Sequence, residues 1–317
     1  SIGPVDTANP IDSSASFDTT VLNAPTVRIV DDGGNYNGHA FPATATAVGT
    51  DGTTPVAGNF TYTYYAGTGT GGTPLSAVPV DVGTYTVVAA FTSGDPDYAY
   101  GSAQVTFTIA RATTALGDLT GQQIIVGTNT TTVSGLLTSN TIIPVGQSVA
   151  ITLDGITKAA AVAADGKFSV VFATGGLDVG AYPITYDYAG DGNFAGATGA
   201  GSLTVAYGSR LLFDNSKPVH SGAALPVKLA LTDAGGSDLS SPWIAVKAVG
   251  LVDSAGHTVP LNDEGHANPG DLFRYSHGLG GYIFNLSTNG LAAGTYTLYY
   301  TAGSDPTRHP LTFVVKS

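Results

Sequence analysis

The sequence predicts an all-β chain of three β-sandwich domains in tandem. Only 11% of its 317 residues are charged, whereas glycine (43 residues), tyrosine (16), threonine and valine are abundant. Short stretches of β-branched and aromatic residues alternate with Gly, Pro and Asp, as expected for many short strands joined by turns. No long stretch keeps the 3.6-residue period that indicates a helix.

A Gly-x-Tyr phrase occurs three times at domain-sized intervals: DVGTYTV from residue 81, DVGAYPI from residue 178 and AAGTYTL from residue 292. After each copy come an alternating strand, a turn that holds Asp95, Asp191 or Asp305, and a second alternating strand. The phrase therefore marks the closing hairpin of a domain, and three copies predict three domains. The Tyr ring can pack inward while its hydroxyl bonds the backbone, an arrangement that resembles the tyrosine corner of immunoglobulin-like sandwiches.

The closing strands also predict the domain boundaries. We expect a leader segment or strand at 1–24 and immunoglobulin-like domains at 25–110, 111–206 and 207–317. The linkers between these domains are short, so we expect a stiff, elongated array.

The charge and composition limit the partners and the cellular location that the sequence allows. The net charge is −12, from 22 Asp and the single Glu264, which argues against nucleic acid and anionic membrane surfaces as partners. There is no Cys, so disulfides are excluded, and no run of 18 apolar residues that predicts membrane insertion. The absence of Met leads us to expect a processed or excised piece of a longer, secreted product.

Three segments resemble known modules. The stretches 217–236 and 273–300 resemble the PxKF-type domain of secreted bacterial and archaeal proteins, whose motif falls on Pro226, Val227, Lys228 and Leu229, with Leu in place of the usual Phe. The stretches 36–49, 62–87 and 94–109 resemble bacterial Ig-like repeats of the MBG type, and 178–205 is similar to another bacterial Ig-like repeat. These resemblances imply immunoglobulin-like sandwiches on an extracellular bacterial protein, without catalytic activity.

Two closing turns predict a calcium site. The pairs Asp95 and Asp97, and Asp191 and Asn193, each place two oxygen ligands in one turn, which suits calcium. Neither turn matches an EF-hand, and an Asx turn needs only one Asp. Both readings stay open, and calcium is the only cofactor that we expect.

Paired tyrosines predict a second kind of site. Tyr62 and Tyr64 share one face of a strand, as do Tyr186 and Tyr188, so each pair either packs in the core or offers a platform on which a sugar ring stacks. The single Trp243, in SSPWIAV, is expected to be the core aromatic residue that an immunoglobulin-like domain places in an early strand.

No residue pattern predicts an enzyme, since the chain has no G-x-S-x-G, no H-E-x-x-H and no Cys. We expect a non-catalytic structural or adhesive segment of a bacterial extracellular or cell-surface protein. Two alternatives stay open: a carbohydrate-binding or spacer region of a secreted polysaccharide-degrading enzyme, and a subunit that self-assembles into a filament or surface layer. The corresponding partners are a polysaccharide, another surface protein and a second copy of the chain.

Overall fold

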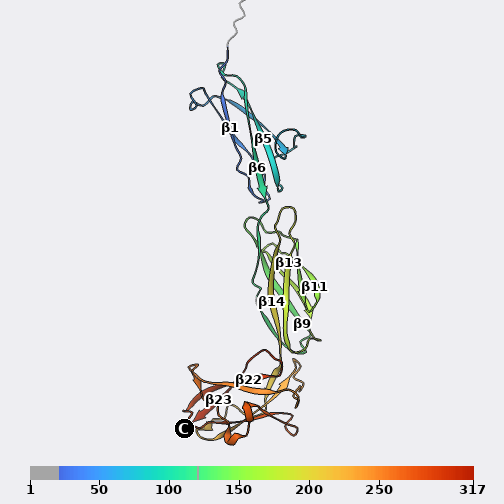
Figure 1. Cartoon of the computed structure of the whole chain (residues 1–317), viewed down its shortest axis with the longest axis vertical. Helices are drawn as coiled ribbons and strands as arrows, with labels where there is room; N and C mark the ends of the chain where they lie inside the picture. Colours follow the sequence, from blue (N-terminus) through green and yellow to red (C-terminus); the bar gives the residue numbers. More distant parts are fainter. Residues whose placement is uncertain (1–20, 120) are drawn as a thin grey trace, which may run out of the picture. The chain divides into compact units, whose positions relative to one another are not determined.

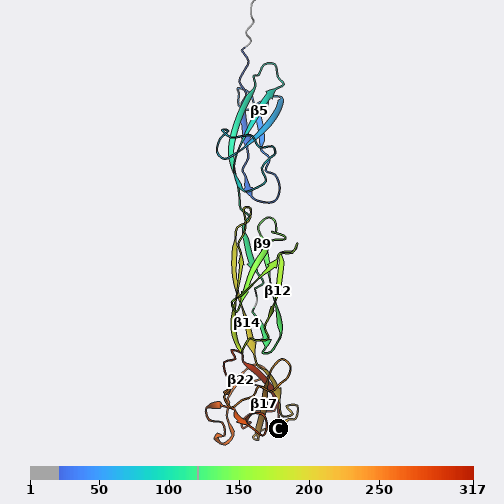
Figure 2. The ribbon, with the colours of Figure 1, turned by 90° about the vertical axis from the view of Figure 1, so that its right-hand side faces the viewer.

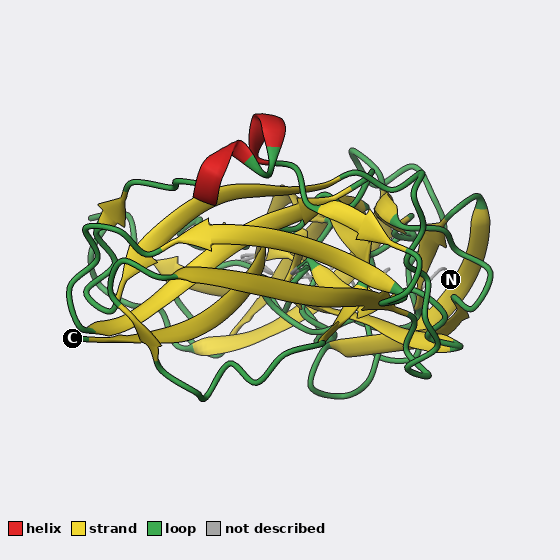
Figure 3. Ribbon diagram, turned by 90° about the horizontal axis from the view of Figure 1, so that it is seen from below, coloured by secondary structure: helices red, strands yellow, loops and turns green. Residues whose placement is uncertain are grey.

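The computed structural model describes residues 21–119 and 121–317, and their regular structure is almost entirely β (Figures 1 and 3). The only helical elements among the described residues are two short 3-10 turns, Glu264–His266 and Pro269–Asp271. The chain divides into two compact units, and the division falls between Arg111 and Ala112. Each unit is described by itself below.

The first unit contains one pair of sheets, called the first sandwich. Strands β1 and β3 form one sheet, and the other has the order β2-β6-β5-β4, in which β2 runs parallel to β6. The strands are β1 (Thr26–Val30), β2 (Gly34–Asn35), β3 (Thr44–Val48), β4 (Gly58–Ala66), β5 (Gly83–Ser93) and β6 (Gly101–Ala110).

The second unit contains two pairs of sheets, and the second sandwich comprises β7 to β14. Its sheets have the orders β12-β9-β7 and β11-β10-β13-β14-β8, in which β8 runs parallel to β14. Figure 2 shows this sandwich with β9, β12 and β14 labelled. The strands are β7 (Thr114–Gly117), β8 (Gln122–Ile125), β9 (Thr130–Ser139), β10 (Ser148–Leu153), β11 (Ile156–Ala161), β12 (Lys167–Ala173), β13 (Gly180–Tyr188) and β14 (Ala197–Ala206).

The third sandwich, β15 to β23, has the most complete topology. Its sheets have the orders β15-β17-β21-β20 and β16-β23-β22-β18-β19, with β16 parallel to β23. The strands are β15 (Gly208–Leu211), β16 (Val219–His220), β17 (Ala224–Thr232), β18 (Val246–Asp253), β19 (Thr258–Val259), β20 (Arg274–Ser276), β21 (Gly281–Ser287), β22 (Gly294–Ala302) and β23 (His309–Lys316). In their order across the sheet, the strands of the first sheet correspond to A, B, E and D of an immunoglobulin-type sandwich, and the second sheet contains C, F and G.

The other two sandwiches share this plan with fewer strands. The second sandwich lacks the strand that corresponds to β20, and the first has no described strand between β4 and β5. The intervening segment, residues 67–82, is rich in glycine and contains two prolines, which cannot donate to a sheet ladder. The three sandwiches therefore contain six, eight and nine strands among the described residues.

The repeated Gly-x-Tyr phrase forms the same corner in all three sandwiches. In each, the Tyr hydroxyl donates to the backbone carbonyl four residues earlier: Tyr85 to Asp81 (3.0 Å), Tyr182 to Asp178 (2.9 Å) and Tyr296 to Ala292 (3.0 Å). Each Tyr lies near the start of the strand that corresponds to F, as in a tyrosine corner. The prediction that the phrase is structural is confirmed.

The cores lie between the two sheets of each sandwich, because alternate strand residues point inward. The third sandwich has one continuous cluster of nineteen buried residues, including Val227, Phe284 and Leu298. In the first sandwich two smaller clusters are described, one around Val87 and Phe107 and the other around Phe91.

An edge of the second sandwich is covered by a lysine. Strand β12 is the outer strand of its sheet, and Lys158 reaches from β11 of the other sheet so that its Nζ donates to the carbonyl of Val171 at 2.7 Å. The same Nζ lies 5.3 Å from the centre of the Phe172 ring. Lysine on an edge strand discourages pairing with another chain.

Most of the expected leader lies outside the described residues. Its last part is bound to the first sandwich, since the N–H of Asn23 donates to Asp97 O and the N–H of Ala99 donates to Asn23 O, both at 2.9 Å. The boundaries expected at residues 110 and 206 stay predictions, because the division into compact units occurs only once.

Candidate functional site

The predicted calcium turn of the first sandwich is closed by its own backbone. Asp95 Oδ1 accepts the N–H of Asp97 at 3.0 Å, and Ser93 Oγ both donates to Asp95 O and accepts the Asp95 N–H. This is an Asx turn supported by a serine. Calcium binding there stays a prediction, because a cation has to share or replace these contacts.

The corresponding turn of the second sandwich is held more tightly. Asp191 Oδ1 accepts the N–H groups of Asn193 (2.7 Å) and Phe194 (2.8 Å), and its Oδ2 accepts Gln147 Nε2 at 2.6 Å. The Gln147 side-chain oxygen in turn accepts the buried Tyr188 hydroxyl at 2.7 Å. Burial, with the charge of Asp191, raises the pKa of Tyr188 to about 12. The acidic turn thus anchors a core tyrosine, and calcium binding at Asp191 and Asn193 also stays a prediction.

In the third sandwich, the turn aspartate contacts the segment that joins it to the second. Asp305 Oδ2 accepts the N–H of Tyr207 at 2.7 Å and contacts His309 Nε2 at 2.8 Å. Its Oδ1 accepts the N–H (2.8 Å) and the hydroxyl (2.6 Å) of Thr307. Burial acts to raise the pKa of Asp305, but the hydrogen bonds from Thr307, Tyr207 and His309 outweigh it and hold the pKa below its usual range.

One further hydrogen bond supports this junction inside the second unit, beside a hollow. The N–H of Ala234, in the loop after β17, donates to the carbonyl of Val126, just after β8, at 2.8 Å. A hollow of about 490 Å³ lies between Val126 and Val179 of the second sandwich and Leu239 and Ile244 of the third. The junction is thus held by hydrogen bonds around a partly apolar space.

Asp31 of the first sandwich has its pKa shifted in the opposite direction to that of Asp305. Asp31 Oδ1 accepts the N–H of Gly33 at 3.0 Å, whereas its Oδ2 is buried without a hydrogen-bond partner. Burial raises the pKa of Asp31, the contact with Gly33 lowers it, and the neighbouring Asp32 raises it, with a net increase.

The structure places three of the four candidate sugar-stacking tyrosines in the core. Tyr64 is 5% exposed and its hydroxyl accepts the N–H of Ala43, while Tyr186 and Tyr188 are each 2% exposed. A sugar ring needs an open aromatic face, so these three rings do not form the expected platform. Tyr62 is half-buried against the same cluster as Tyr64, and its stacking role stays a prediction.

The expectation for Trp243 is wrong. Its side chain is 90% exposed, and it lies in the loop between β17 and β18, three residues before β18 begins at Val246. The core aromatic residues of the third sandwich come instead from the strands and from Phe273. The signal that places Trp243 outside the strand is the preceding Ser-Ser-Pro, which is typical of a turn.

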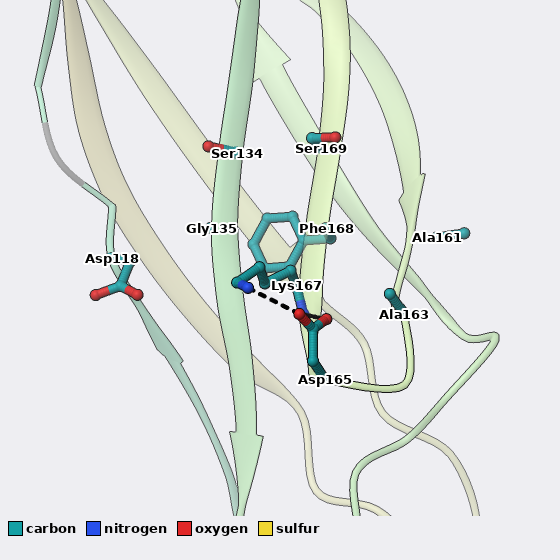
Figure 4. Close-up of a pocket in the computed structure, with 9 residues that line it drawn as sticks. All are labelled: Asp118, Ser134, Gly135, Ala161, Ala163, Asp165, Lys167, Phe168 and Ser169. Carbon is teal, nitrogen blue, oxygen red and sulfur yellow. Dashed lines mark hydrogen bonds and ion pairs between the residues drawn. The ribbon is translucent and has the colours of Figure 1, made fainter.

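A larger hollow, of about 690 Å³, lies on the second sandwich (Figure 4). The ring of Phe168 fills the space beside Gly135, where a Cβ atom would lie 2.5 Å from the ring. At the rim, Lys167 and Asp165 form an ion pair of 2.8 Å in which both side chains are well exposed. The Lys167 contact lowers the pKa of Asp165, and Asp165 raises the pKa of Lys167. A surface ion pair of this kind contributes little to stability.

Within residues 21–119 and 121–317, no group of three or more His, Asp or Glu side chains is arranged to hold a metal ion. In the same part of the chain, none of the helical segments has the length and apolar character needed to cross a bilayer.

No protein-family model matches the sequence, and no curated protein sequence matches it. The PxKF-type and MBG-type resemblances therefore stay hypotheses from the sequence.

The solved structures that the chain resembles are similar to it only at low identity and low TM-score. The I9–I11 tandem of titin is 10% identical with a TM-score of 0.29, and the similarity covers 92% of this chain and 98% of that one. Domains 4–9 of the surface layer protein SbsC are 16% identical with a TM-score of 0.30, covering 92% and 47%. The Yersinia pseudotuberculosis adhesin InvE is 18% identical with a TM-score of 0.27, covering 65% and 59%. At these values the similarities bear on neither function nor partner, and the fold assignment rests on the strand pairings.

Proposed function

We propose that this chain is a non-catalytic structural segment of a bacterial extracellular or cell-surface protein, where it spaces other parts and transmits tension between them. The observation that carries the proposal is that the second strand of every sandwich runs parallel to the last: β2 to β6, β8 to β14 and β16 to β23. The resemblance to bacterial surface repeats supports the extracellular setting.

The parallel pair determines how tension acts on each sandwich. Because both strands run in one direction, the chain enters at one end of the pair and leaves at the other. A pull between these ends acts along the strands and loads all hydrogen bonds of the pair together. By contrast, an antiparallel hairpin that is pulled at its open end loses its bonds one at a time.

One backbone hydrogen bond extends each pair beyond its second strand. These bonds join Tyr36 N–H to Ala110 O (2.8 Å), Val126 N–H to Ala206 O (2.9 Å) and Ser221 N–H to Lys316 O (2.9 Å). The β8–β14 register includes four residue pairs, whereas β2–β6 and β16–β23 each include two. We therefore expect the second sandwich to resist tension most.

Single-molecule pulling of the full chain by its two ends tests this proposal. Val126→Pro removes the N–H that bonds Ala206, whereas Val126→Ala shortens the same side chain and keeps that N–H. We expect Val126→Pro to lower the force of the strongest unfolding event and Val126→Ala to leave it near the wild-type value. Equal unfolding forces for the wild type and Val126→Pro contradict the proposal.

A further inference from the structure

Trp243 is the most exposed aromatic residue among the large exposed hydrophobic side chains of the described chain. It is 90% exposed, compared with 74% for Tyr100 in the first sandwich. A tryptophan buries a large apolar area when it is covered, and its indole N–H also needs a partner. An indole ring that is 90% exposed is therefore a candidate contact for a ligand that covers the ring.

The loop that carries Trp243 is ordered by hydrogen bonds to the core tyrosine Tyr282 and to strand β17. The buried Tyr282 hydroxyl accepts the N–H of Ser241 at 2.9 Å and donates to the Ser241 carbonyl at 3.0 Å. Ser241 Oγ in turn accepts the Trp243 N–H at 3.2 Å, and Ser240 Oγ accepts the N–H of Leu231 in β17 at 2.9 Å. A ring presented on an ordered loop loses little conformational entropy when it binds.

The surroundings of Trp243 indicate the chemistry of its ligand. Along the loop, Trp243 follows Ser240, Ser241 and Pro242 and precedes Ile244, which is half-buried against the core of the third sandwich. The loop also carries the exposed Asp238. Asp238 Oδ1 accepts the N–H of Ser240 at 2.8 Å, and its other oxygen takes no hydrogen bond from the described part of the chain. The hot spot of a protein interface lies instead among other apolar contacts that exclude water.

We propose that Trp243 is a binding site for carbohydrate, on which a pyranose ring stacks its apolar C–H face. A sugar has one ring-sized apolar face bordered by hydroxyl groups, which fits one exposed aromatic ring on a loop of hydroxyl and carboxylate groups. Asp238 and the serine hydroxyls supply hydrogen-bonding groups on the same loop. This site goes beyond the proposed structural role and does not depend on it.

The single tryptophan makes the test specific. Selective excitation of indole in the full chain reports Trp243 alone, because the chain contains no other Trp. We expect the emission to change when soluble gluco-, manno- or xylo-oligosaccharides are titrated in, and we expect the chain to be retained by at least one of insoluble cellulose, chitin and xylan. Trp243→Ala should weaken this retention about tenfold or more, and Trp243→Tyr should restore part of it.

Tyr100→Ala is the matched control, since it removes the other strongly exposed aromatic ring and should leave retention unchanged. Circular dichroism and thermal unfolding check that each variant is folded. Retention that survives Trp243→Ala overturns the proposal, as does the absence of both retention and an emission change with every carbohydrate in the panel. An emission change that depends on protein concentration alone also overturns it and indicates self-association instead.

Discussion

The first and third sandwiches are built on one plan with different amounts of sheet and core. Both have a tyrosine corner, a turn aspartate between the last two strands and a parallel pair of second and last strands. The third adds strands at both sheets and encloses one continuous core, whereas the first replaces a strand with the irregular segment 67–82 and has smaller described clusters. The closing hairpin is thus the constant part, and the number of strands around it varies in both sheets.

The first sandwich compensates for its missing strand with a buried side chain. Thr86 in β5 is fully buried, its hydroxyl donates to Gly67 O at 2.9 Å, and it accepts the Gly69 N–H at 2.8 Å. Thr86 therefore helps to hold the start of the segment 67–82, and the backbone bonds from Leu75 N–H to Tyr64 O (2.8 Å) and from Phe41 N–H to Pro79 O (3.0 Å) hold the rest. Local polar contacts can replace sheet pairing where the sequence is too rich in Gly and Pro for a strand.

Core truncation should give the largest effect and should separate the two units. Phe284→Ala in the third sandwich and Phe91→Ala in the first remove rings that are 0% and 2% exposed, and each should cost about 3–5 kcal/mol of unfolding free energy. Urea unfolding of the full chain followed by circular dichroism checks whether each variant shifts only the transition of its own unit. Val249→Ala, on an exposed side chain, is the control. A shift of both transitions by either variant contradicts the division into two units.

Replacing the turn aspartates should have a smaller effect on the unfolding free energy, and the effect should differ between Asp305 and Asp95. Asp305→Ala leaves the Tyr207 N–H and the Thr307 groups without their acceptor, and should cost about 1–3 kcal/mol. Asp95→Ala removes one exposed Asx contact and should cost about 0.5 kcal/mol. Calorimetry of the full-length variants measures both. Equal losses would show that the contact with Tyr207 adds nothing to the turn.

Lowering the pH should raise the contribution of Asp31 to the stability of the first sandwich and lower the contribution of Asp305 to that of the third. The lowered pKa of Asp305 means that the unfolded state binds the proton more readily, so its contribution is present above the unfolded pKa near 3.8 and is lost as the pH falls below it. The raised pKa of Asp31 means that the folded state binds the proton more readily, so its contribution to stability increases as the pH falls through that raised value. Thermal unfolding between pH 7 and about pH 2 should show these trends, and Asp31→Asn and Asp305→Asn should each remove one. A trend that persists in its own variant belongs to other carboxyl groups.

The smallest stability effect is expected at Trp243. Trp243→Ala should change the unfolding free energy by no more than about 0.5 kcal/mol, because the ring is 90% exposed. Replacing a core tryptophan by alanine would lower the unfolding free energy by about 3–5 kcal/mol. Urea unfolding distinguishes these values directly, and a loss in the upper range contradicts the exposed position.

Features that depend on a local residue pattern could be predicted from the sequence. The tyrosine corners were predictable, because the hydrogen bond spans four residues and the Gly-x-Tyr phrase recurs. Alternation also predicted that Tyr186 and Tyr188 share a face, but it could not say that this face is the core, since that depends on the second sheet. The prediction that Trp243 lies in the core followed the position of a core aromatic in an early strand of immunoglobulin-like domains, whereas here the ring lies in the loop before β18.

The contact between Asp305 and Tyr207 could not be predicted. It joins residues 98 positions apart, and Asp95 and Asp191 occur at corresponding turns with different partners. Only the packing of the third sandwich against its linker segment determines which partner the carboxylate finds.

Lys158, which reaches from β11 to the open edge of β12, also has a consequence for folding during synthesis. Neighbouring sandwiches of similar plan emerge one after another, and an open edge on one is a template for a strand of the next before that strand finds its own sheet. Lys158 occupies the carbonyl of Val171 and places a charge at that edge. Misassembly between repeats is thereby discouraged at the point in the second sandwich where one sheet ends without a partner strand.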